Sequence, residues 1–376
     1  MSTWAALAMA WGGLAGGFSA VALARLMRRR PAAASTRVPV LLLRPVDAPT
    51  PREVENLATP IDYPGPLEHV VLAPERPPLP EHVRWVPSEP STPNRKVGHL
   101  LHALRVLPRE GRVVLVVDAD VVVTGELVAG LAAPVAAGVA LSTAVPTPVG
   151  ARGLSGRAVA ALLRRTHHSF RALHVMSAGA AAVCGKALGL SDRAVEELPA
   201  LADHIGEDLE LSKRLHARGL GVALCEVPAV VPLAAGDWDA ALARFTRWMQ
   251  VLRSHRPGLY PTVPLLFTPT WPLLVLGMAV GSPGLLGCVA ALVAVRTLLS
   301  WRLAWLSAPG AHAGGSEGGA LRFALDWLLG EALLLAAFVR SLAHPPRVTW
   351  RGRVYALHPG GRMSPGWTEL KQEGGV

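Results

Sequence analysis

Long apolar runs stand at both ends of this sequence, and they restrict a soluble fold to the residues between them. The first run, residues 4–27, is apolar except for Arg25 and is long enough to cross a bilayer as one helix. Three further runs follow Pro261, at residues 263–281, 283–303 and 323–343. Hydrophobic residues make up 51% of the chain and the mean hydropathy is +0.34, which is high for a soluble protein. The sequence therefore predicts one soluble domain held between membrane segments.

Basic residues directly after the first run predict its orientation. Arg28, Arg29 and Arg30 follow it at once, which places that end on the cytoplasmic side and the N-terminus outside. A cleaved signal peptide is the alternative, but this run is long for a signal peptide and its charges follow it instead of preceding it. We therefore expect an uncleaved anchor over residues 4–27. The heavy use of Ala, Arg, Gly and Pro suggests a bacterial source, and hence an inner membrane.

The later runs leave the side of the C-terminus open. The tail, residues 344–376, is basic at Arg347, Arg351, Arg353 and Arg362, which predicts a cytoplasmic tail. A cytoplasmic domain and a cytoplasmic tail require an even number of spans between them, whereas the membrane region, residues 263–343, contains three apolar runs. Either one run is re-entrant or interfacial, or the tail lies outside.

Alternating strand and helix patterns fill the segment between the membrane runs. Short aliphatic runs predict strands and capped or amphipathic stretches predict helices, in the order strand 38–43, helix 51–58, strand 69–72, helix 94–106 and a strand that ends at Asp118. This succession is typical of an α/β domain with a doubly wound, mostly parallel sheet. We expect this domain over residues 37–238. In such sheets ligands bind at the carboxyl ends of the strands.

Two aspartates follow one of these strands. Asp118 and Asp120 come directly after Val113–Val117, a run with the composition of a buried parallel strand. Carboxylates at such a position are costly unless a cation meets them. Mg²⁺ or Mn²⁺ holding a diphosphate meets this need, because both ions bind carboxylate and phosphate oxygens. The alternative is a strand end whose aspartates cap the next loop, and the short motif alone does not decide between the two.

A helix with acidic residues in its first turn is predicted over residues 207–218. Glu207 and Asp208 open this helix, basic residues occupy its last turn, and Gly219 follows it. The two carboxylates either stabilise the helix dipole, by about 0.3–1 kcal/mol each, or belong to an active site.

A basic amphipathic helix is predicted over residues 239–254, in an interfacial segment of residues 239–256. Arg244 and Arg247 accompany Trp248 and further apolar residues, an arrangement that suits the membrane interface. An ordinary interfacial helix is the alternative. Chance rarely supplies Asp-x-Asp after a strand, Glu-Asp at a helix start and Arg-x-x-Arg-Trp on a basic helix in this order, so we interpret the three motifs as one site.

The net charge of +10 and the pI near 10.5 indicate an anionic partner. Arginines flank the apolar runs, and the sequence has no RNA-binding signature or zinc-finger spacing. We therefore expect a lipid bilayer and no nucleic acid as the partner. Three widely spaced cysteines give no metal motif and no disulfide framework, so we expect them to be reduced core residues: Cys184, Cys225 and Cys288.

Taken together, the motifs resemble the lipid-linked and processive glycosyltransferases of the family 2 type, which have a GT-A fold. Within that group the chain most resembles the ceramide glucosyltransferases of family 21. The similar stretches span nearly the whole chain: LLLRPVDAPTPREVENLATPIDYPGPLEHVVL, PNRKVGHLLHAL, VVDADVVV, GEDLELSKRLHARG, RFTRWMQVLR and RVTWRGRVYAL. The resemblance implies a GT-A catalytic domain with one N-terminal transmembrane helix and C-terminal membrane helices. Bacterial relatives that glycosylate hopanoids share much of the pattern, which leaves the acceptor lipid open.

The resemblance also implies roles for the acidic residues. Asp120 matches a direct metal ligand, and Asp118 matches the shell around the metal and the sugar nucleotide. Asp208 matches the general base that takes the proton from the acceptor hydroxyl, and Glu207 precedes it as in the family. Lys96 matches a position close to the donor.

Arg244, Arg247 and Trp248 match the family's (Q/R)xxRW element, near the donor diphosphate and the acceptor. Arginine suits that place because negative charge grows on the leaving diphosphate in the transition state.

Two positions depart from the family pattern. Glu75 stands nearest to the place of an aspartate that contacts the nucleotide base in the family. His167 or His168, of which we take His168 as the candidate, stands near the place of a family histidine close to the acceptor, and the segment that follows is shorter here. A structural histidine is the alternative.

The expected function is transfer of a single sugar from a UDP-sugar to a lipid hydroxyl, by an inverting mechanism that depends on Mg²⁺ or Mn²⁺. The resemblance implies glucose as the sugar and ceramide as the acceptor, with a hopanoid or another bacterial lipid as the alternative. A processive polysaccharide synthase is a second alternative, but such enzymes have more transmembrane helices than the apolar runs here allow. A non-catalytic membrane scaffold or transporter subunit is a third, and it would not need carboxylates at a strand end.

Overall fold

A computed structural model of the chain describes residues 3–28, 36–176, 183–233, 236–307, 319–350 and 353–365. These residues divide into two compact units. Unit 1 combines residues 1–29, 147–175 and 233–346, and unit 2 combines residues 30–146, 176–232 and 347–376. Each unit therefore gathers segments that lie far apart in the sequence.

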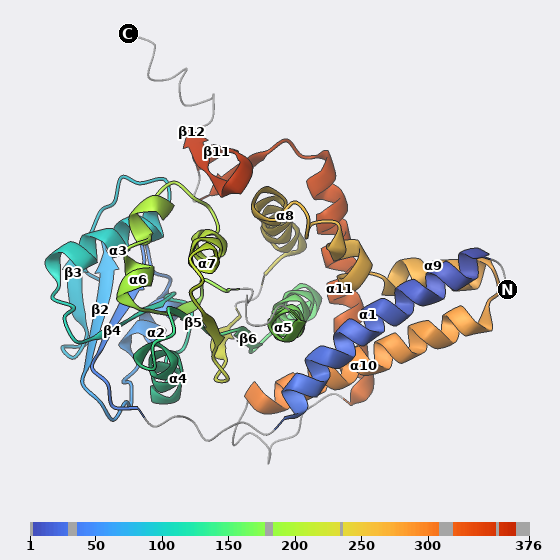
Figure 1. The fold of residues 1–376 in the computed structure, drawn as a ribbon, viewed down its shortest axis with the longest axis horizontal. Coiled ribbons are helices and arrows are strands. Elements are labelled where there is room, and N and C mark those ends of the chain that lie inside the picture. The colour runs from blue at the N-terminus through green and yellow to red at the C-terminus, as the bar shows by residue number, and fades with distance from the viewer. Residues whose placement is uncertain are drawn as a thin grey trace, which may run out of the picture. The chain divides into compact units, whose positions relative to one another are not determined.

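A seven-stranded sheet forms the centre of unit 2 (Figure 1), in the order β3-β2-β1-β4-β7-β5-β8. Neighbours from β3 to β4 are parallel, as are β5 and β8, whereas β7 runs antiparallel to both of its neighbours. This mostly parallel sheet confirms the predicted α/β fold class. The strands of unit 2 outside the tail are β1 Val40–Pro45, β2 Leu67–Ala73, β3 Arg84–Pro87, β4 Val113–Val117, β5 Leu141–Thr143, β7 Ala187–Leu190, β8 Val222–Leu224 and β9 Ala229–Pro232.

The helices of unit 2 begin where the sequence supplies capping residues. Thr50 and Glu53 form a reciprocal capping box at the start of one helix, with Pro51 at its first position. The Asn94 and Thr124 side chains accept backbone N–H bonds at the starts of two others. The helices are α2 Pro51–Ala58, α3 Arg95–Val106, α4 Gly125–Ala136, α6 Asp192–Val195, the 3₁₀ turn η1 Leu198–Leu201 and α7 Glu207–Ala217.

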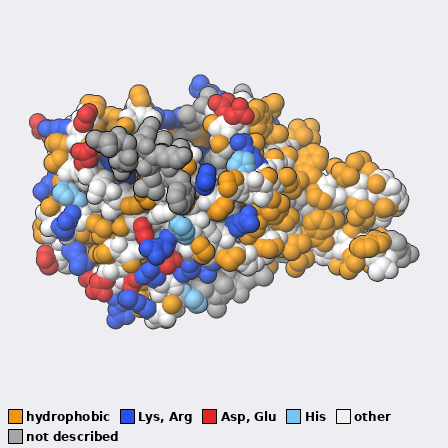
Figure 2. Space-filling view, turned by 90° about the horizontal axis from the view of Figure 1, so that it is seen from above, with side chains coloured by type: hydrophobic (Ala, Val, Ile, Leu, Met, Phe, Trp, Pro, Cys, Tyr) orange, Lys and Arg blue, Asp and Glu red, His pale blue; other side chains and the backbone are white. Residues whose placement is uncertain are grey.

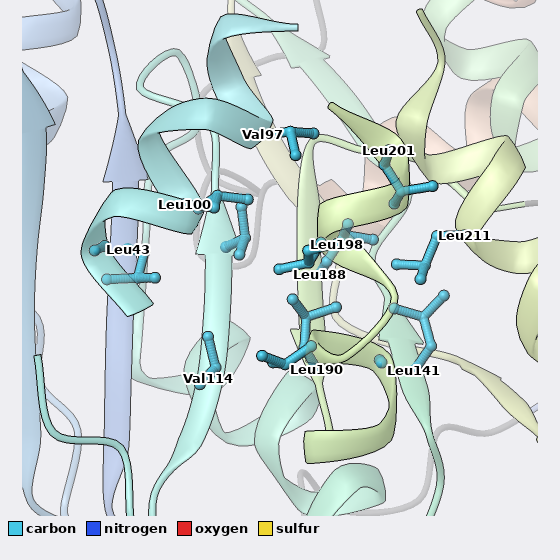
Figure 3. Packing of buried hydrophobic residues seen from close by; sticks show 14 of the residues in the cluster. Leu43, Val97, Leu100, Val114, Leu141, Leu188, Leu190, Leu198, Leu201 and Leu211 are labelled. Atoms are coloured by element: carbon cyan, nitrogen blue, oxygen red, sulfur yellow. The ribbon is translucent and has the colours of Figure 1, made fainter. Parts of the chain in front are cut away.

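The core of unit 2 lies between the sheet and helices α3 and α7 (Figure 3). Strands β1, β4, β5 and β7 contribute Leu43, Val114, Leu141 and Leu188, which are at most 4% exposed. Facing side chains come from α3, η1 and α7: Val97, Leu100, Leu198, Leu201 and Leu211. This packing fixes the starts of α3 and α7 relative to the carboxyl end of β4.

Residues after the last helix form a small antiparallel sheet that belongs to unit 2. Its strands are β10 Arg347–Trp350, β11 Arg353–Leu357 and β12 Met363–Pro365. The sequence predicted only a basic tail here, so this sheet is a feature that the charge pattern did not reveal.

Unit 1 is built mainly of helices. Helix α1 lies beside α10 (Figure 1), and Phe18 and Ala22 of α1 pack with Leu299 and Leu303 of α10. The elements of unit 1 are α1 Thr3–Met27, strand β6 (Pro146–Val149, from the end of unit 2), α5 Gly153–Met176, α8 Trp238–His255, the π-helical turn η2 Val263–Phe267, α9 Thr270–Ala279, α10 Pro283–Ser307 and α11 Ala320–Ala343.

Two described helices are long and apolar enough to cross a membrane, Thr3–Met27 and Pro283–Leu303. Figure 2 shows hydrophobic side chains gathered over the end of unit 1 that α1, α9 and α10 form. Large apolar side chains such as Trp4, Leu14 and Met278 are more than half exposed there, which suits contact with lipid.

The run predicted over residues 263–281 is not one continuous helix, because a break at Thr268 and Pro269 separates η2 from α9. Buried polar side chains satisfy the backbone at the break. Arg165 donates to the Phe267 carbonyl at 2.7 Å, and Arg296 donates to the Leu266 carbonyl at 2.8 Å. Glu331 accepts from the Thr270 N–H at 2.7 Å and pairs with both arginines. Such compensation is what a broken helix in an apolar environment requires.

Candidate active site

The Asp-x-Asp pair lies at the carboxyl end of β4, as the sequence predicts. Asp118 follows the last residue of β4, and its N–H donates to the Lys186 carbonyl at 2.9 Å. Because β7 is antiparallel to β4, the residues that precede β7 lie at this same edge of the sheet. The edge therefore gathers the ends of β1, β2 and β4 and the start of β7.

Two lysines meet these aspartates. Lys96 Nζ lies 2.8 Å from Asp118 Oδ1, and Lys186 Nζ lies 3.1 Å from Asp118 Oδ2. Lys186 Nζ also lies 2.6 and 2.8 Å from the two oxygens of Asp120. Burial alone would raise the pKa of Asp118, but the two ammonium groups lower it to about 2. Asp118 is therefore ionised at neutral pH. The side chains of Asp118 and Asp120 stay 27% and 33% exposed.

Glu207 and Asp208 lie at the same place, at the start of α7. Lys96 Nζ, besides contacting Asp118, lies 3.3 Å from Glu207 Oε1 and donates to the Gly185 carbonyl at 2.6 Å. Burial lowers the pKa of Lys96 on its own, but the carboxylates of Asp118 and Glu207 raise it above its ordinary value. One buried ammonium group thus connects the Asp-x-Asp strand with the helix that begins Glu-Asp.

Asp208 has an environment unlike that of the other carboxylates. One of its oxygens accepts from the Gly185 N–H at 2.6 Å and the other from the Leu209 N–H at 2.9 Å. Burial and the charge of Glu207 raise the pKa of Asp208 to about 7, although Lys96 lowers it. A carboxyl with this pKa exchanges protons near neutral pH, as a general base must.

Glycines shape the backbone around these carboxylates. Gly206, directly before α7, has φ of +71°, a left-handed conformation that other residues adopt at a cost. A Cβ added at Gly185 would lie 3.3 Å from both Asp208 Oδ2 and Glu207 Oε1. The absence of a side chain at this position lets the carboxylates approach the backbone.

Arg44 holds the backbone of the Asp-x-Asp turn, and it was not among the residues predicted from the sequence. It is the last residue but one of β1 and its side chain is fully buried. Its Nη2 lies 3.0, 3.2 and 2.6 Å from the carbonyls of Asp118, Ala119 and Val121. Burial lowers the pKa of Arg44 to about 10, against the raising effect of Asp120 and Asp118. This arginine fixes the turn that presents the two aspartates. A charge in the otherwise apolar run VLLLRP was the available signal.

The remaining predicted residues lie after β2, on α8 and on α5. Glu75 is exposed, two residues beyond β2, at the same edge of the sheet. Arg244 and Trp248 lie together on α8 of unit 1, with the guanidinium carbon 5.5 Å from the ring centroid. Arg247 lies on the same helix, and the roles of these three residues stay predictions. The side chains of His167 and His168, on α5, lie outside the described residues.

The donor set at Asp118 and Asp120 fits a hard divalent cation. No group of three or more His, Cys, Asp or Glu side chains able to hold a metal occurs among the residues that the structure describes. A Mg²⁺ or Mn²⁺ ion here would take one or two carboxylates from the protein and its other ligands from substrate phosphate and water, which is a common arrangement for Mg²⁺.

A mostly parallel sheet with an Asp-x-Asp pair and a Glu-Asp helix start at one carboxyl edge is the architecture of a GT-A glycosyltransferase. The chain belongs to glycosyl transferase family 21, whose family model matches residues 80–363, more than half of its length. The predicted family and enzyme class are thus confirmed. The match includes Lys96, both motifs and α8, whereas Glu75 lies outside it.

Among solved structures, the chain is similar to the mannosyltransferase PcManGT from Pyrobaculum calidifontis, determined in complex with GDP-Man and Mn²⁺. The two share 18% sequence identity over 90% of this chain and 98% of that chain, with a TM-score of 0.49. No curated protein matches the chain.

Proposed function

We propose that this protein transfers a single sugar from a UDP-sugar to the hydroxyl of a membrane lipid, with inversion at the anomeric carbon and with Mg²⁺ or Mn²⁺ as the cofactor. Glucose is the expected sugar and ceramide the expected acceptor. Family membership supports sugar transfer, while the donor and the lipid follow from the resemblance of the motifs to ceramide glucosyltransferases.

The observation that carries the proposal is the contact of Lys96 with both acidic motifs. Its Nζ lies within 3.3 Å of Asp118 and Glu207. It thereby joins the donor side of the site, at Asp118, to the base side, at Glu207 and Asp208. An inverting displacement needs these two functions close to one another, because a base and a neutralised leaving group act on opposite sides of the same carbon.

Asp208 is the proposed general base. At a pH above its pKa of about 7 the carboxylate is available to accept the proton of the acceptor hydroxyl. The hydroxyl oxygen forms a bond to the anomeric carbon while the bond from that carbon to the diphosphate oxygen breaks. The electron pair of that bond leaves with UDP, and the proton ends on Asp208.

Cations of the protein neutralise the leaving diphosphate. Lys96 and Lys186 present ammonium groups at the Asp-x-Asp turn. Asp118 and Asp120 would hold the divalent ion, which supplies charge neutralisation of the diphosphate when it is bound. Arg244 and Arg247 are proposed to contribute further positive charge. Burial and the charge of Arg244 lower the pKa of Arg247, which means that its positive charge is disfavoured. An anion bound between the two guanidinium groups would stabilise that charge.

The proposed location is a bacterial inner membrane, with the catalytic domain on the cytoplasmic side. The C-terminal sheet belongs to the same unit as the active site, which supports a tail on that same side. The chain must then cross the bilayer an even number of times between β9 and β10. Helix α10 supplies one crossing, and the broken segment of residues 263–279 supplies the other, at about 25 Å of helix against about 30 Å of hydrocarbon. Helix α11 would not cross.

Two alternatives differ in acceptor and in product length. Bacterial relatives of this type make a hopanoid or another bacterial lipid an equally testable acceptor. A processive polysaccharide synthase needs a channel of transmembrane helices, and only two described helices are long and apolar enough to span. Transfer of a single sugar is therefore favoured.

Sugar transfer by the purified protein tests the proposal. UDP-glucose, UDP-galactose, UDP-glucuronic acid and UDP-N-acetylglucosamine are each combined with ceramide, diacylglycerol and a hopanoid, with Mn²⁺ or with EDTA. Asp208→Asn serves as the blank, and Asp192→Asn, an exposed aspartate that opens α6, serves as the matched control. We expect one glycolipid that requires the metal, disappears in the blank and persists in the control. Absence of transfer together with absence of UDP-sugar binding would refute the proposal.

A further inference from the structure

The small C-terminal sheet is attached to the loop that leads into the catalytic helix. The Met363 N–H donates to the Asp203 carbonyl at 2.7 Å, and the Ile205 N–H donates to the Gly361 carbonyl at 2.9 Å. Between these two bonds, His204 and Arg362 form an antiparallel bridge. The loop therefore pairs with the tail as a short strand, three residues before Glu207.

Side chains add to this pairing. Arg362 Nε donates to Asp203 Oδ2 at 3.0 Å, but the Arg362 side chain is 65% exposed, and an ion pair so open to solvent contributes little to stability. Inside the sheet, Val348, Tyr355 and Met363 are 6% exposed or less. The two backbone bonds, more than the ion pair, hold the tail on the loop.

The opposite side of the same loop is also held. The Asn94 side chain donates to the His204 carbonyl at 2.7 Å and to Glu207 Oε2 at 3.1 Å, and the Asn94 N–H donates to the Ala202 carbonyl at 2.9 Å. Asn94 caps α3 two residues before Lys96. The loop from residue 202 to Glu207 is thus fixed between Asn94, at the start of α3, and the tail. Asn94 contacts one side of this loop and the tail contacts the other.

We propose that the C-terminal sheet, residues 347–365, is a positioning element of the active site, which sets the start of α7 and with it the place of Glu207 and Asp208. This inference rests on the proposed role of Asp208 as the base. It assigns to residues beyond the membrane helices a part in catalysis, although none of them touches a reacting atom. Misplacement of a catalytic group by about 1 Å can reduce the rate by roughly 100-fold, so a short pairing has a large kinetic consequence.

The variant Met363→Pro tests whether the tail positions the loop, because it is designed to remove a bond to the loop while the tail itself stays folded. Directly before β12, the Arg362 carbonyl accepts from the His358 N–H of the tail, whereas the Met363 N–H donates to the Asp203 carbonyl of the loop. Of these two backbone bonds, Met363→Pro removes only the one to Asp203. Arg362 has φ of −65° and ψ of 136°, which a following proline accepts. Met363→Ala is the matched control, because it also removes the buried side chain but keeps the N–H.

The test uses the full chain in nanodiscs, with UDP-glucose and the best lipid acceptor from the panel above. In Met363→Pro we expect kcat to fall by about 10- to 100-fold while KM for the donor changes less than threefold. Hydrogen exchange of the amides from residue 203 to 210 should accelerate at least tenfold. In Met363→Ala kcat should stay within threefold of wild type, with slow exchange.

The outcomes separate this inference from the proposed function. If the exchange of the loop is unchanged in Met363→Pro, or if kcat is unchanged while exchange accelerates, the tail does not position the site. Equal losses of kcat in both variants would mean that packing alone matters, which also overturns the inference. If wild type transfers no sugar, the proposed function fails, and the exchange data still decide whether the tail holds the loop.

Discussion

Replacing Asp208 by asparagine should lower activity and, above pH 7, favour stability. The carboxyl has a pKa of about 7 in the folded protein against an ordinary value of 3.8, because burial and the charge of Glu207 disfavour its ionised form. The folded state thus binds this proton more tightly than the unfolded chain does. The contribution of the group to stability is full below about pH 4 and is lost as the pH rises through 7.

The magnitude follows from the difference between the two pKa values. Ionising Asp208 at pH 8 costs the folded protein at most about 4 kcal/mol, at about 1.4 kcal/mol for each pH unit. Because the side chain keeps some contact with solvent and shares charge with Glu207 and Lys96, we expect about 1–3 kcal/mol. Asparagine loses one of the two backbone bonds that the carboxylate accepts, which costs about 1 kcal/mol at every pH. Only the pH-dependent part therefore reports the pKa.

The assay is thermal unfolding of metal-free and donor-free protein in detergent between pH 4.5 and 8.5. The unfolding temperature of wild type minus that of Asp208→Asn should fall by about 2–12 °C across this range, at about 2–4 °C per kcal/mol for a domain of this size. Glu68→Gln is the control, because burial raises the pKa of Glu68 but Arg112 and Arg84 lower it below its ordinary value of 4.5. Its contribution to stability is complete above that value and is lost only at lower pH, so for this variant the difference should stay nearly constant across the range.

The kinetic half of the prediction uses the same variant. Removing the base should lower kcat by about 10²- to 10⁴-fold, and the wild-type rate should rise with pH through a midpoint near 7. Parallel curves of unfolding temperature against pH for wild type and Asp208→Asn would show that Asp208 ionises at its ordinary pKa. In that case it cannot be the base that this reasoning requires.

Three further predictions concern the supports of the site and of the membrane unit. Lys186→Ala frees both oxygens of Asp120 from the ammonium group, so Mn²⁺ binding measured by electron paramagnetic resonance should tighten about fivefold. Arg44→Met leaves three carbonyls of the Asp-x-Asp turn without their charged donor, which should cost about 2–4 kcal/mol in thermal unfolding and raise KM for the donor. Glu331→Gln leaves two buried arginines without their carboxylate, and a loss of about 3–5 kcal/mol should appear in the unfolding of the full chain.

A half-buried lysine and an exposed arginine away from the site serve as controls for the first two of these predictions. Lys213→Ala, on the surface of α7, should not change Mn²⁺ binding, and Arg76→Met should unfold within about 1 °C of wild type. Weaker Mn²⁺ binding in Lys186→Ala would mean that the ammonium group does not compete with the metal. For Arg44→Met and Glu331→Gln, unfolding at the wild-type temperature would contradict the calculated losses.

Local patterns were sufficient to predict most elements of unit 2. Helix α2 begins at a capping box with proline at its first position, and β4 is a run of five aliphatic residues, so each is specified by its own sequence. The edge of the sheet where Asp118, Asp120, Glu207 and Asp208 meet follows from the parallel order of the strands. For these features, local sequence and tertiary structure agree.

The residues that the sequence analysis missed depend on long-range pairing. Lys186 reaches Asp120, 66 residues away, only because β7 pairs antiparallel with β4. No local sequence pattern predicts that β7 runs in the opposite direction to β4. The C-terminal sheet was predicted as a basic tail because its arginines dominated the pattern, although Val348, Val354 and Tyr355 are residue types that favour strands. Contacts of this kind require the topology of the whole chain.

The position of the C-terminal sheet also bears on the number of membrane spans. In the proposed membrane topology, a tail that pairs with the loop from Asp203 to Ile205 lies on the catalytic side of the bilayer, so the chain leaves that side and returns. The broken segment η2–α9 can serve as the outward crossing only if its interrupted backbone is satisfied, and the buried cluster around Glu331 satisfies it. The proposed topology therefore depends both on the polar cluster of unit 1, which satisfies the broken crossing, and on the tail of unit 2, which sets the side to which the chain returns. If the proposed topology and the proposed role of the tail are right, a variant that destroys the polar cluster should impair sugar transfer even when the sheet of unit 2 stays folded, because the tail would reach the active site only after the membrane segments have formed.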